Sequence, residues 1–408
     1  MILSAFMALV LAVIEAAAGF AAGSIAENQC LIAGRSVLSE YQPQLYDRYG
    51  VLAMRSDERR LSDLTMFYLT QAQIMSTGLV KISPVSVEAD SSAFSGEDIS
   101  QLEDQIVQIS GYMAVKSALD EAGLSKLIED IISGKAAENY DGEGVEEELD
   151  ELAKKPEKEP DDPEEAGSFI ERRKQAVELR RSYRNAFRTY GRPKKGNMVE
   201  RLAGYVKDDL FAVNYSMRVC SNRAAPMSDT VLRYESEYLL FGGRSDPVNE
   251  KAMKTALFAF RFAVDLAGIL SDSAEMASIH AAALSFFLLP EPLVVAVLVA
   301  VRAARLASQQ TDAILAGESV PIVSGLKFGK YEDYLALFLC SVPKSVLLSR
   351  LMTLMEQNVQ IKDKADFSFA EYCYGYELRA EFSKRTHLPD FLGITRRKSV
   401  IEQVHGYV

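Results

Sequence analysis

The stretch ILSAFMALVLAVIEAAAGFAAGSIA, residues 2–26, decides how the chain is organised, and Glu15 is its only ionisable side chain. A helix rises about 1.5 Å per residue, so this stretch is roughly 37 Å long and can cross the ~30 Å hydrocarbon core of a bilayer with some tilt. A lone segment in lipid must satisfy its own backbone hydrogen bonds, and a helix does this. The sequence therefore predicts a membrane anchor over residues 1–27, with the remaining chain on one side of the membrane.

Two other interpretations of this stretch stay open. A cleaved secretory signal has a basic start and a shorter apolar run, but the small residues at 16–18 and 21–23 resemble a cleavage site. A buried core helix is the third interpretation, although such helices usually have a polar face. The length of the apolar run and the missing basic start favour retention as an anchor.

Three residues in the anchor are candidates for contact with other helices. A carboxylate at membrane depth is costly, by about 2.5 kcal/mol or more near the centre, so Glu15 either pairs with a cation on a neighbouring helix, lies near the interface, or is protonated. Gly19 and Gly23 are four residues apart, a spacing that allows close approach of a second helix. We therefore expect Glu15, Gly19 and Gly23 to serve anchoring and assembly.

The orientation of the anchor is predicted from its flanks. Arg35, Arg48 and Arg55 follow the segment and no base precedes it, which by the positive-inside rule favours a cytoplasmic body. Long polar domains, however, translocate largely regardless of charge. We expect a single-pass protein of the cell membrane with the bulk of the chain extracytoplasmic and membrane lipid as one partner.

The net charge of −12 over 408 residues is unevenly distributed. Residues 135–167 hold 14 acids and 4 bases, and residues 168–207 hold 12 bases and 3 acids. The acidic block has three prolines and few large apolar residues, which predicts a disordered loop, and the adjacent opposite charges are expected to compensate each other.

A basic helix is predicted over residues 168–190. Its bases belong to a solvated face, to a surface for anionic lipid, or to a nucleic-acid site. Ile170, Val177, Tyr183 and Phe187 form a candidate core-facing stripe, which favours the solvated face, and the anchor argues against nucleic acid.

The rest of the chain predicts a mainly α protein with a small antiparallel β-sheet. Membrane-proximal helices and a strand are expected in 28–134, and a helical domain in 168–385 whose C-terminal aromatic strand (367–382) pairs with 78–89. Pro84 makes the latter an edge or bulged strand. The apolar run 279–301 is interpreted as a buried helical hairpin split at Pro290, or alternatively as a membrane or re-entrant element. Residues 386–408 are expected to form a basic tail.

The most distinctive segment of the body is LRYESEYLLFGGRSDPVN, residues 232–249. It predicts an extended segment, a glycine turn, and a helix capped by Ser245 or Asp246 with Pro247 in its first turn. On a strand, Glu235 and Glu237 would face the same way, as acid/base chemistry requires, but a structural role is favoured because no nucleophile or metal-binding histidine accompanies them. The segment's motif residues are Tyr234, Glu235, Glu237, Tyr238, Gly242, Gly243, Ser245, Asp246 and Asn249.

Cofactor and metal signatures are absent from the sequence. The four cysteines are widely spaced, and Cys340 and Cys373 either form one disulfide or remain buried thiols. We expect no cofactor, no metal and no catalytic residue.

Several stretches together resemble the TadE/TadG-like accessory proteins of Flp (tight-adherence, Tad) pilus systems, and more closely a Gram-positive family of uncharacterised function often encoded beside such systems. They are the anchor with Glu15, residues 36–54 (SVLSEYQPQLYDRYGVLAM), residues 234–249, and YEDYLALFL at 331–339 followed by the aromatic strand. The resemblance implies a membrane-anchored, pseudopilin-like component or accessory of an envelope assembly.

We therefore expect a non-enzymatic single-pass envelope protein that contacts other pilus or secretion components through its helix and exported domain. Two alternatives remain: a membrane-tethered hydrolase using Glu235, Glu237 or Asp246, and a sensor module that binds a small ligand among the apolar helices. No hydrolase, P-loop or dinucleotide motif supports the enzyme.

Overall fold

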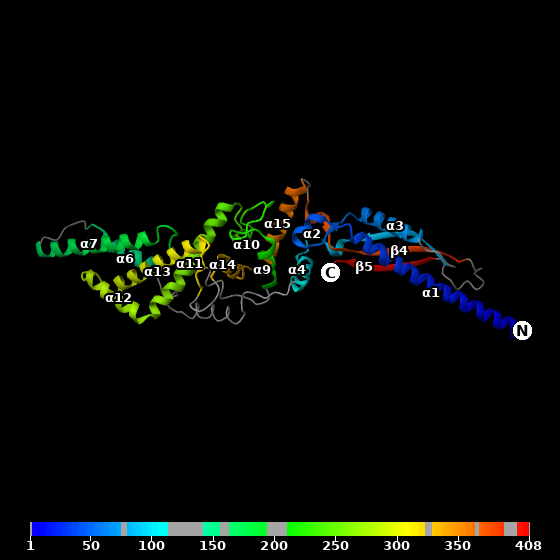
Figure 1. Cartoon of the computed structure of the whole chain (residues 1–408), viewed down its shortest axis with the longest axis horizontal. Coiled ribbons are helices and arrows are strands. Elements are labelled where there is room, and N and C mark those ends of the chain that lie inside the picture. The colour runs from blue at the N-terminus through cyan, green and yellow to red at the C-terminus, as the bar shows by residue number, and fades with distance from the viewer. Residues whose placement is uncertain are drawn as a thin grey trace. The chain divides into compact units, whose positions relative to one another are not determined.

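The computed structural model describes residues 2–74, 80–112, 142–155, 163–193, 210–322, 329–363, 367–386 and 398–407. The chain forms two compact units, one made of Met1–Ala114 with Leu351–Val408 and the other of Val115–Arg350. The elements of both are coloured by position along the chain in Figure 1. As predicted, the protein is mostly helical with small antiparallel sheets and an apolar N-terminal helix.

The first unit is built on α1 (Ile2–Leu38), one continuous helix of 37 residues. Its second half is buried at positions spaced three to four apart, which places small side chains on one face of the helix. This face packs with α3 (Glu58–Ile74) and the sheet in a shared core. The residues of α1 in that core are Ala22, Ala26, Cys30, Ala33 and Val37.

The main sheet has the strand order β2 (Val80–Asp90), β4 (Gly375–Thr386), β5 (Lys398–Gly406), with antiparallel pairing throughout. β4 is central because its alternate side chains Tyr376, Leu378, Ala380 and Phe382 are apolar and enter the core. β2 is an edge strand, and its register shifts between Pro84 and Ser86, as expected where proline removes a ladder donor.

Two C-terminal predictions need correction. The expected strand over 367–382 begins only at Gly375: residues 369–371 form a 3-10 turn, and β3 (Tyr372–Cys373) pairs with β1 (Met54–Arg55) in a separate two-stranded sheet. The expected tail contains β5, in which Ile401 and His405 face inward and Val400 and Val404 outward. Of the inward positions 399, 401, 403 and 405 only Ile401 is apolar, so no apolar alternation in the sequence indicated this strand.

Shorter helices complete the first unit. α2 (Pro43–Tyr49) begins with Pro43 and ends before Gly50, whose φ of 69° is left-handed and favours glycine. α4 (Ile99–Tyr112) and the second half of α15 (Lys344–Asp363) follow in chain order. Buried Gln105 holds the chain at Leu52 by accepting from its N–H and donating to its carbonyl.

The second unit is helical and its core lies between α11 (Asp246–Ser271), α13 (Glu291–Leu315) and α7 (Pro163–Ala186). Asp272 begins α12 (Ser273–Ala283) by accepting from the N–H groups of Ala274 and Glu275. Residues 279–301 thus turn at Pro290, as the predicted hairpin does, but its first arm is buried only at Ile279, Ala283 and Leu289 and exposes Leu284 and Phe287. The remaining elements are α6 (Gly142–Ala153), α9 (Leu210–Val219), α10 (Glu235–Phe241), η3 (Leu284–Phe286) and α14 (Tyr331–Leu339).

The disordered acidic loop expected over 135–167 is wrong for residues 142–153, which form α6, and for residues 163–167, which begin α7. Leu149 and Ala153 are buried and Val145 packs beside them, so the few apolar residues share one helical face against α7. Residues 135–141 and 156–162 lie outside the described residues. The unit boundaries also differ from the expected domains, because residues 351–385 join the N-terminal unit through their pairing with β2.

Candidate functional site

The first half of α1 is apolar and exposed. Leu3 is 76% exposed, Val13 60% and Phe20 82%. Only 6% of the most apolar 18-residue stretch of the helix is buried. Within the described ranges α1 is the one straight helix long and apolar enough to cross a membrane. The bent pair α14–α15, at 116°, passes the same test together, but Tyr334, Leu335 and Phe338 of α14 are core residues.

The change from exposed to packed occurs at Ala22, which is the first buried residue of α1. The exposed part, residues 3–21, is about 28 Å long, close to the ~30 Å thickness of the hydrocarbon core. Beyond it the helix lies so close to β5 that a Cβ added at Gly34 would come within 2.3 Å of the His405 ring. The same helix is therefore a candidate membrane span and a structural part of the first unit.

The three predicted anchor residues lie at or beside this change. Glu15 is partly buried, as are residues 10–12, 18 and 19 of the same half, and Gly19 follows it by one turn. An added Cβ at Gly23 would meet no atom within 4 Å, so the helix surface there is open. These positions can accept a neighbouring helix without displacing the sheet.

The motif at 232–249 is organised differently from its prediction. Residues 235–241 form α10 and not an extended strand, so Glu235 and Glu237 point to different sides of a helix. Ser245 occupies the N-cap position of α11 without a side-chain capping bond. Asp246 instead accepts from the backbone N–H groups of Arg233 and Tyr234, each at 3.0 Å. Carboxylate bonding to the preceding loop, invisible in sequence, replaces the expected cap.

Both glutamates of α10 are buried and bind the same loop. Glu235 Oε2 accepts from the Ser221 N–H at 2.8 Å. Glu237 Oε1 accepts from the Tyr331 hydroxyl at 2.6 Å and from the Arg223 N–H at 3.1 Å. Burial raises the pKa of Glu237, and the Tyr331 hydroxyl and Arg223 N–H partly offset the rise by stabilising the charged form.

The glycines of the motif allow close packing at the end of α10. Gly242 has a φ of 71° and its N–H donates to Tyr238 O, which closes the helix. A side chain at Gly243 would come within 2.3 Å of Asn249 Oδ1, and Asn249 Nδ2 donates to Gly243 O at 2.9 Å. Arg350 covers the same end by donating to the carbonyls of Leu239 and Leu240.

The carboxylates of this motif therefore hold the loop between α9 and α10 by its backbone amides. Sequence reasoning missed Ser221, Arg223 and Tyr331 as their partners, because no local pattern connects residues so far apart. Across the described part of the chain, no group of three or more His, Cys, Asp or Glu side chains is arranged to hold a metal ion. Cys30, Cys220, Cys340 and Cys373 are all buried free thiols.

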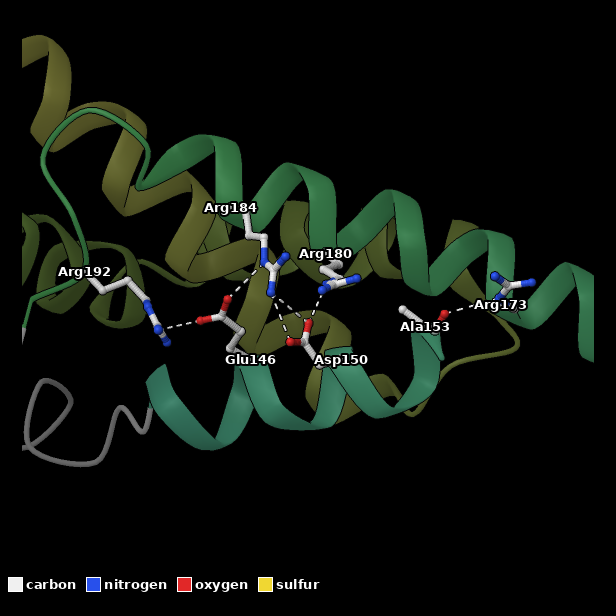
Figure 2. A network of polar contacts seen from close by, with 7 residues as sticks. All are labelled: Glu146, Asp150, Ala153, Arg173, Arg180, Arg184 and Arg192. Carbon is white, nitrogen blue, oxygen red and sulfur yellow. Dashed lines mark hydrogen bonds and ion pairs between the residues drawn. The ribbon is translucent and has the colours of Figure 1, made fainter. Parts of the chain in front are cut away.

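The basic helix α7 pairs with α6, and Figure 2 shows the acids of α6 facing the arginines of α7. Asp150 contacts Arg180 and Arg184, and Glu146 contacts Arg184 at 3.0 Å and Arg192 at 2.6 Å. The predicted compensation of the two charge blocks is thus observed between these residues. The predicted apolar stripe holds only in part, because Tyr183 and Phe187 are buried while Ile170 and Val177 are about half exposed.

A surface cleft of about 720 Å³ lies in the second unit. It is lined from α11 by Lys251 and Lys254, from the loop after α9 by Arg223, and from the end of α13 by Asp312. Tyr190, from the segment after α7, donates its hydroxyl to Asp312 there. We call it the Arg223 cleft.

The fold and α1 define a class of protein: an α+β protein that carries an N-terminal helix long and apolar enough to span a membrane. The chain belongs to a family of unknown function, DUF5702, whose model matches residues 167–327 and 324–384, more than half of the chain. The matched part contains the 234–249 motif and the Arg223 cleft and excludes α1. Neither the curated proteins nor the solved structures contain a match.

Proposed function

We propose that this protein is a non-enzymatic, single-pass component of the cell envelope, an accessory or pseudopilin-like part of a Tad/Flp-type pilus or secretion apparatus with an extracytoplasmic body. The observation that carries the proposal is the division of α1 into an exposed apolar half of membrane-spanning length and a half packed on the sheet.

Continuity of α1 matters for such a role. The described helix has no break between its two halves, so the span and the first unit are joined without a flexible linker. A contact made by one half is thereby transmitted to the other as rigid-body movement. A protein that only needed tethering would not require a helix built into its core.

Two features favour assembly through the helix. The surface at Gly23 is open, and Glu15 at membrane depth is most stable where a neighbouring protein supplies a polar partner. We propose a Tad/Flp-type apparatus because three stretches resemble TadE/TadG-like proteins: residues 36–54, 234–249 and 331–339.

We propose that the protein is not an enzyme, because its candidate carboxylates are engaged in hydrogen bonds to the backbone. Glu235, Glu237 and Asp246 each accept from backbone N–H groups, and the first two are fully buried. Carboxylates committed to main-chain amides inside a core cannot reach a substrate, which argues against the hydrolase alternative.

The test is photocrosslinking in the native membrane. A benzophenone amino acid replaces Val13 or Phe20 in the exposed half of α1, and Val404, which is 65% exposed on β5, provides the matched control. We expect Val13 or Phe20 to yield adducts with a component of the pilus or secretion apparatus, identified by mass spectrometry, at several times the control yield. Adducts with lipid alone at both α1 positions would contradict the assembly role.

A further inference from the structure

The Arg223 cleft is lined by three cationic side chains, and one of them, Arg223, is held in place by hydrogen bonds. Arg223 comes from the loop that Glu237 holds, and its own side chain is anchored at two points. Its Nη1 donates to Glu250 at 2.9 Å and its Nη2 to the carbonyl of Leu315 at 3.3 Å. These contacts use two of its five N–H groups, and among the described residues the other three have no protein acceptor.

The two lysines of the cleft differ in their partners. Lys254 pairs with Glu250 at 2.8 Å, so Glu250 bridges it to Arg223. Lys251 has no carboxylate within ion-pair distance among the residues that the structure describes, although it lines the same cleft one turn earlier on α11. Lys251 is therefore a cation whose charge is balanced by no described neighbour.

The charge of the cleft fits a small anion. Arg223, Lys251 and Lys254 are opposed by Asp312 and by the adjacent Glu250, which leaves one excess positive charge. Asp312 already accepts from the Tyr190 hydroxyl, and burial, followed by this contact, raises the pKa of Tyr190. Arg223 also covers the carbonyl of Leu315, so the negative end of α13 is partly neutralised.

Two threonine hydroxyls also line the cleft, and they differ in their hydrogen bonds. Thr255 donates to the Lys251 carbonyl and is committed, whereas Thr189 lines the cleft with no described acceptor for its proton. A guanidinium, an ammonium and a hydroxyl donating from three different segments suit a ligand with several acceptor oxygens arranged around one atom. The volume is within the ~300–1,000 Å³ typical of small-molecule sites.

We propose that the Arg223 cleft binds a phosphoryl group, carried by a soluble phosphomonoester or by the phosphodiester of a lipid headgroup or polymer. Lys251, Arg223 and the Thr189 hydroxyl donate to its oxygens, and charge-assisted bonds of this kind are the stronger ones. Buried Glu237 acts as a positioning residue, because its bond to the Arg223 N–H holds the loop in place. This site is separate from the assembly surface of α1 and does not depend on it.

The experiment uses the full-length chain in micelles of a zwitterionic detergent. Phosphorus-31 NMR follows binding of inorganic phosphate, glycerol 3-phosphate and glycerophosphoglycerol, and acetate is tested as a competitor. Lys251→Ala removes the uncompensated charge, Lys251→Arg retains it, and Lys155→Ala removes another exposed lysine, which follows α6 and lies outside the cleft.

We expect saturable binding of at least one phosphate probe. We also expect Lys251→Ala to weaken it about fivefold or more, Lys251→Arg to stay within about twofold of the native chain, and Lys155→Ala to change nothing. Tighter binding of glycerophosphoglycerol assigns the ligand to phosphodiesters, and tighter binding of glycerol 3-phosphate assigns it to monoesters. Lack of saturable binding by all three probes, equal competition by acetate, or equal loss in Lys155→Ala would overturn the proposal.

Discussion

Gly34 and Gly23 lie on the same helix and have opposite surroundings. At Gly34 an added Cβ would come within 2.3 Å of the His405 ring, whereas at Gly23 it would meet nothing within 4 Å. Alanine stabilises a helix relative to glycine by about 1 kcal/mol. Whether Gly→Ala stabilises or destabilises the protein at each of these positions is therefore decided by the space available for the added Cβ. The docking of α1 on β5 thus depends on one position where only glycine fits.

The first prediction compares these two glycines. Gly34→Ala is expected to destabilise the first unit by about 1–3 kcal/mol, because His405 must move from a packed site. Gly23→Ala is expected to be neutral or to stabilise by up to about 1 kcal/mol. Amide hydrogen exchange of β5 measures both, and equal protection in the two variants would show that Gly34 is not a close contact.

His405 is buried beneath α1 with no acceptor for a second proton. Its Nε2 has no hydrogen-bond partner among the described residues, and its ring lies 5.6 Å from that of Tyr376. Burial, and secondarily Arg35, lower the pKa of His405 below 6.5. The folded form therefore binds this proton less tightly than the unfolded chain, so its stability falls as the pH drops below about 6.5.

The second prediction concerns this loss of stability at low pH. Acidification from pH 7 to pH 5 is expected to reduce hydrogen-exchange protection in β5, and His405→Phe is expected to remove much of this dependence. His280 is exposed beside Glu291 in the second unit and provides the control. A β5 pH profile that His280→Gln flattens as much as His405→Phe does would contradict the assignment.

Among the elements, α6 and α7 allow two stabilising effects to be compared. The ion pairs of Asp150 and Glu146 with arginines are numerous, but most of the partners are a third to a half exposed. Exposed pairs contribute about 0–1 kcal/mol each and weaken in salt. Leu149, in contrast, is completely buried against the α7 core. Apolar burial should therefore dominate the pairing of these helices.

The third prediction compares the contributions of apolar burial and of ion pairs to stability. Leu149→Ala is expected to cost about 2–4 kcal/mol in the unfolding free energy of the second unit, and Asp150→Ala less than about 1 kcal/mol. Chemical denaturation at low and high salt measures both values. A larger loss in Asp150→Ala, or a native stability that falls steeply with salt, would mean that the ion pairs dominate.

Elements with strong apolar periodicity could be predicted from the sequence. The helix α11, the turn at Pro290 between α12 and α13, and the edge position of β2 at Pro84 could all be predicted from local pattern. α6 was not, because charge hid a stripe of four apolar residues whose partner helix follows later in the chain. An extended segment was expected for α10 because its Tyr and Glu residues alternate as in a strand, whereas its glutamates bind the preceding loop and Tyr331, contacts that the alternation does not indicate.

On the scale of the whole molecule, the sequence indicated attachment better than organisation. The apolar start of the chain predicted a helix long and apolar enough to span a membrane, but not that the same helix packs on a sheet built from both ends of the chain. That arrangement depends on β2, β4 and β5 meeting across about 300 intervening residues, which no local pattern encodes. The Arg223 cleft is likewise assembled from four separate segments.

The central claim is that α1 remains embedded in the membrane and carries the body on one side. Alkaline carbonate extraction of membranes tests it most directly, with the full-length chain compared to a Leu9→Lys, Val13→Lys double variant. Two lysines inside a span cost several kcal/mol, whereas both positions are exposed and their replacement leaves the packed half of α1 unchanged. The account predicts that the native chain stays in the membrane pellet and that the double variant moves to the supernatant; a native chain released by carbonate, or equal retention of both, would contradict it.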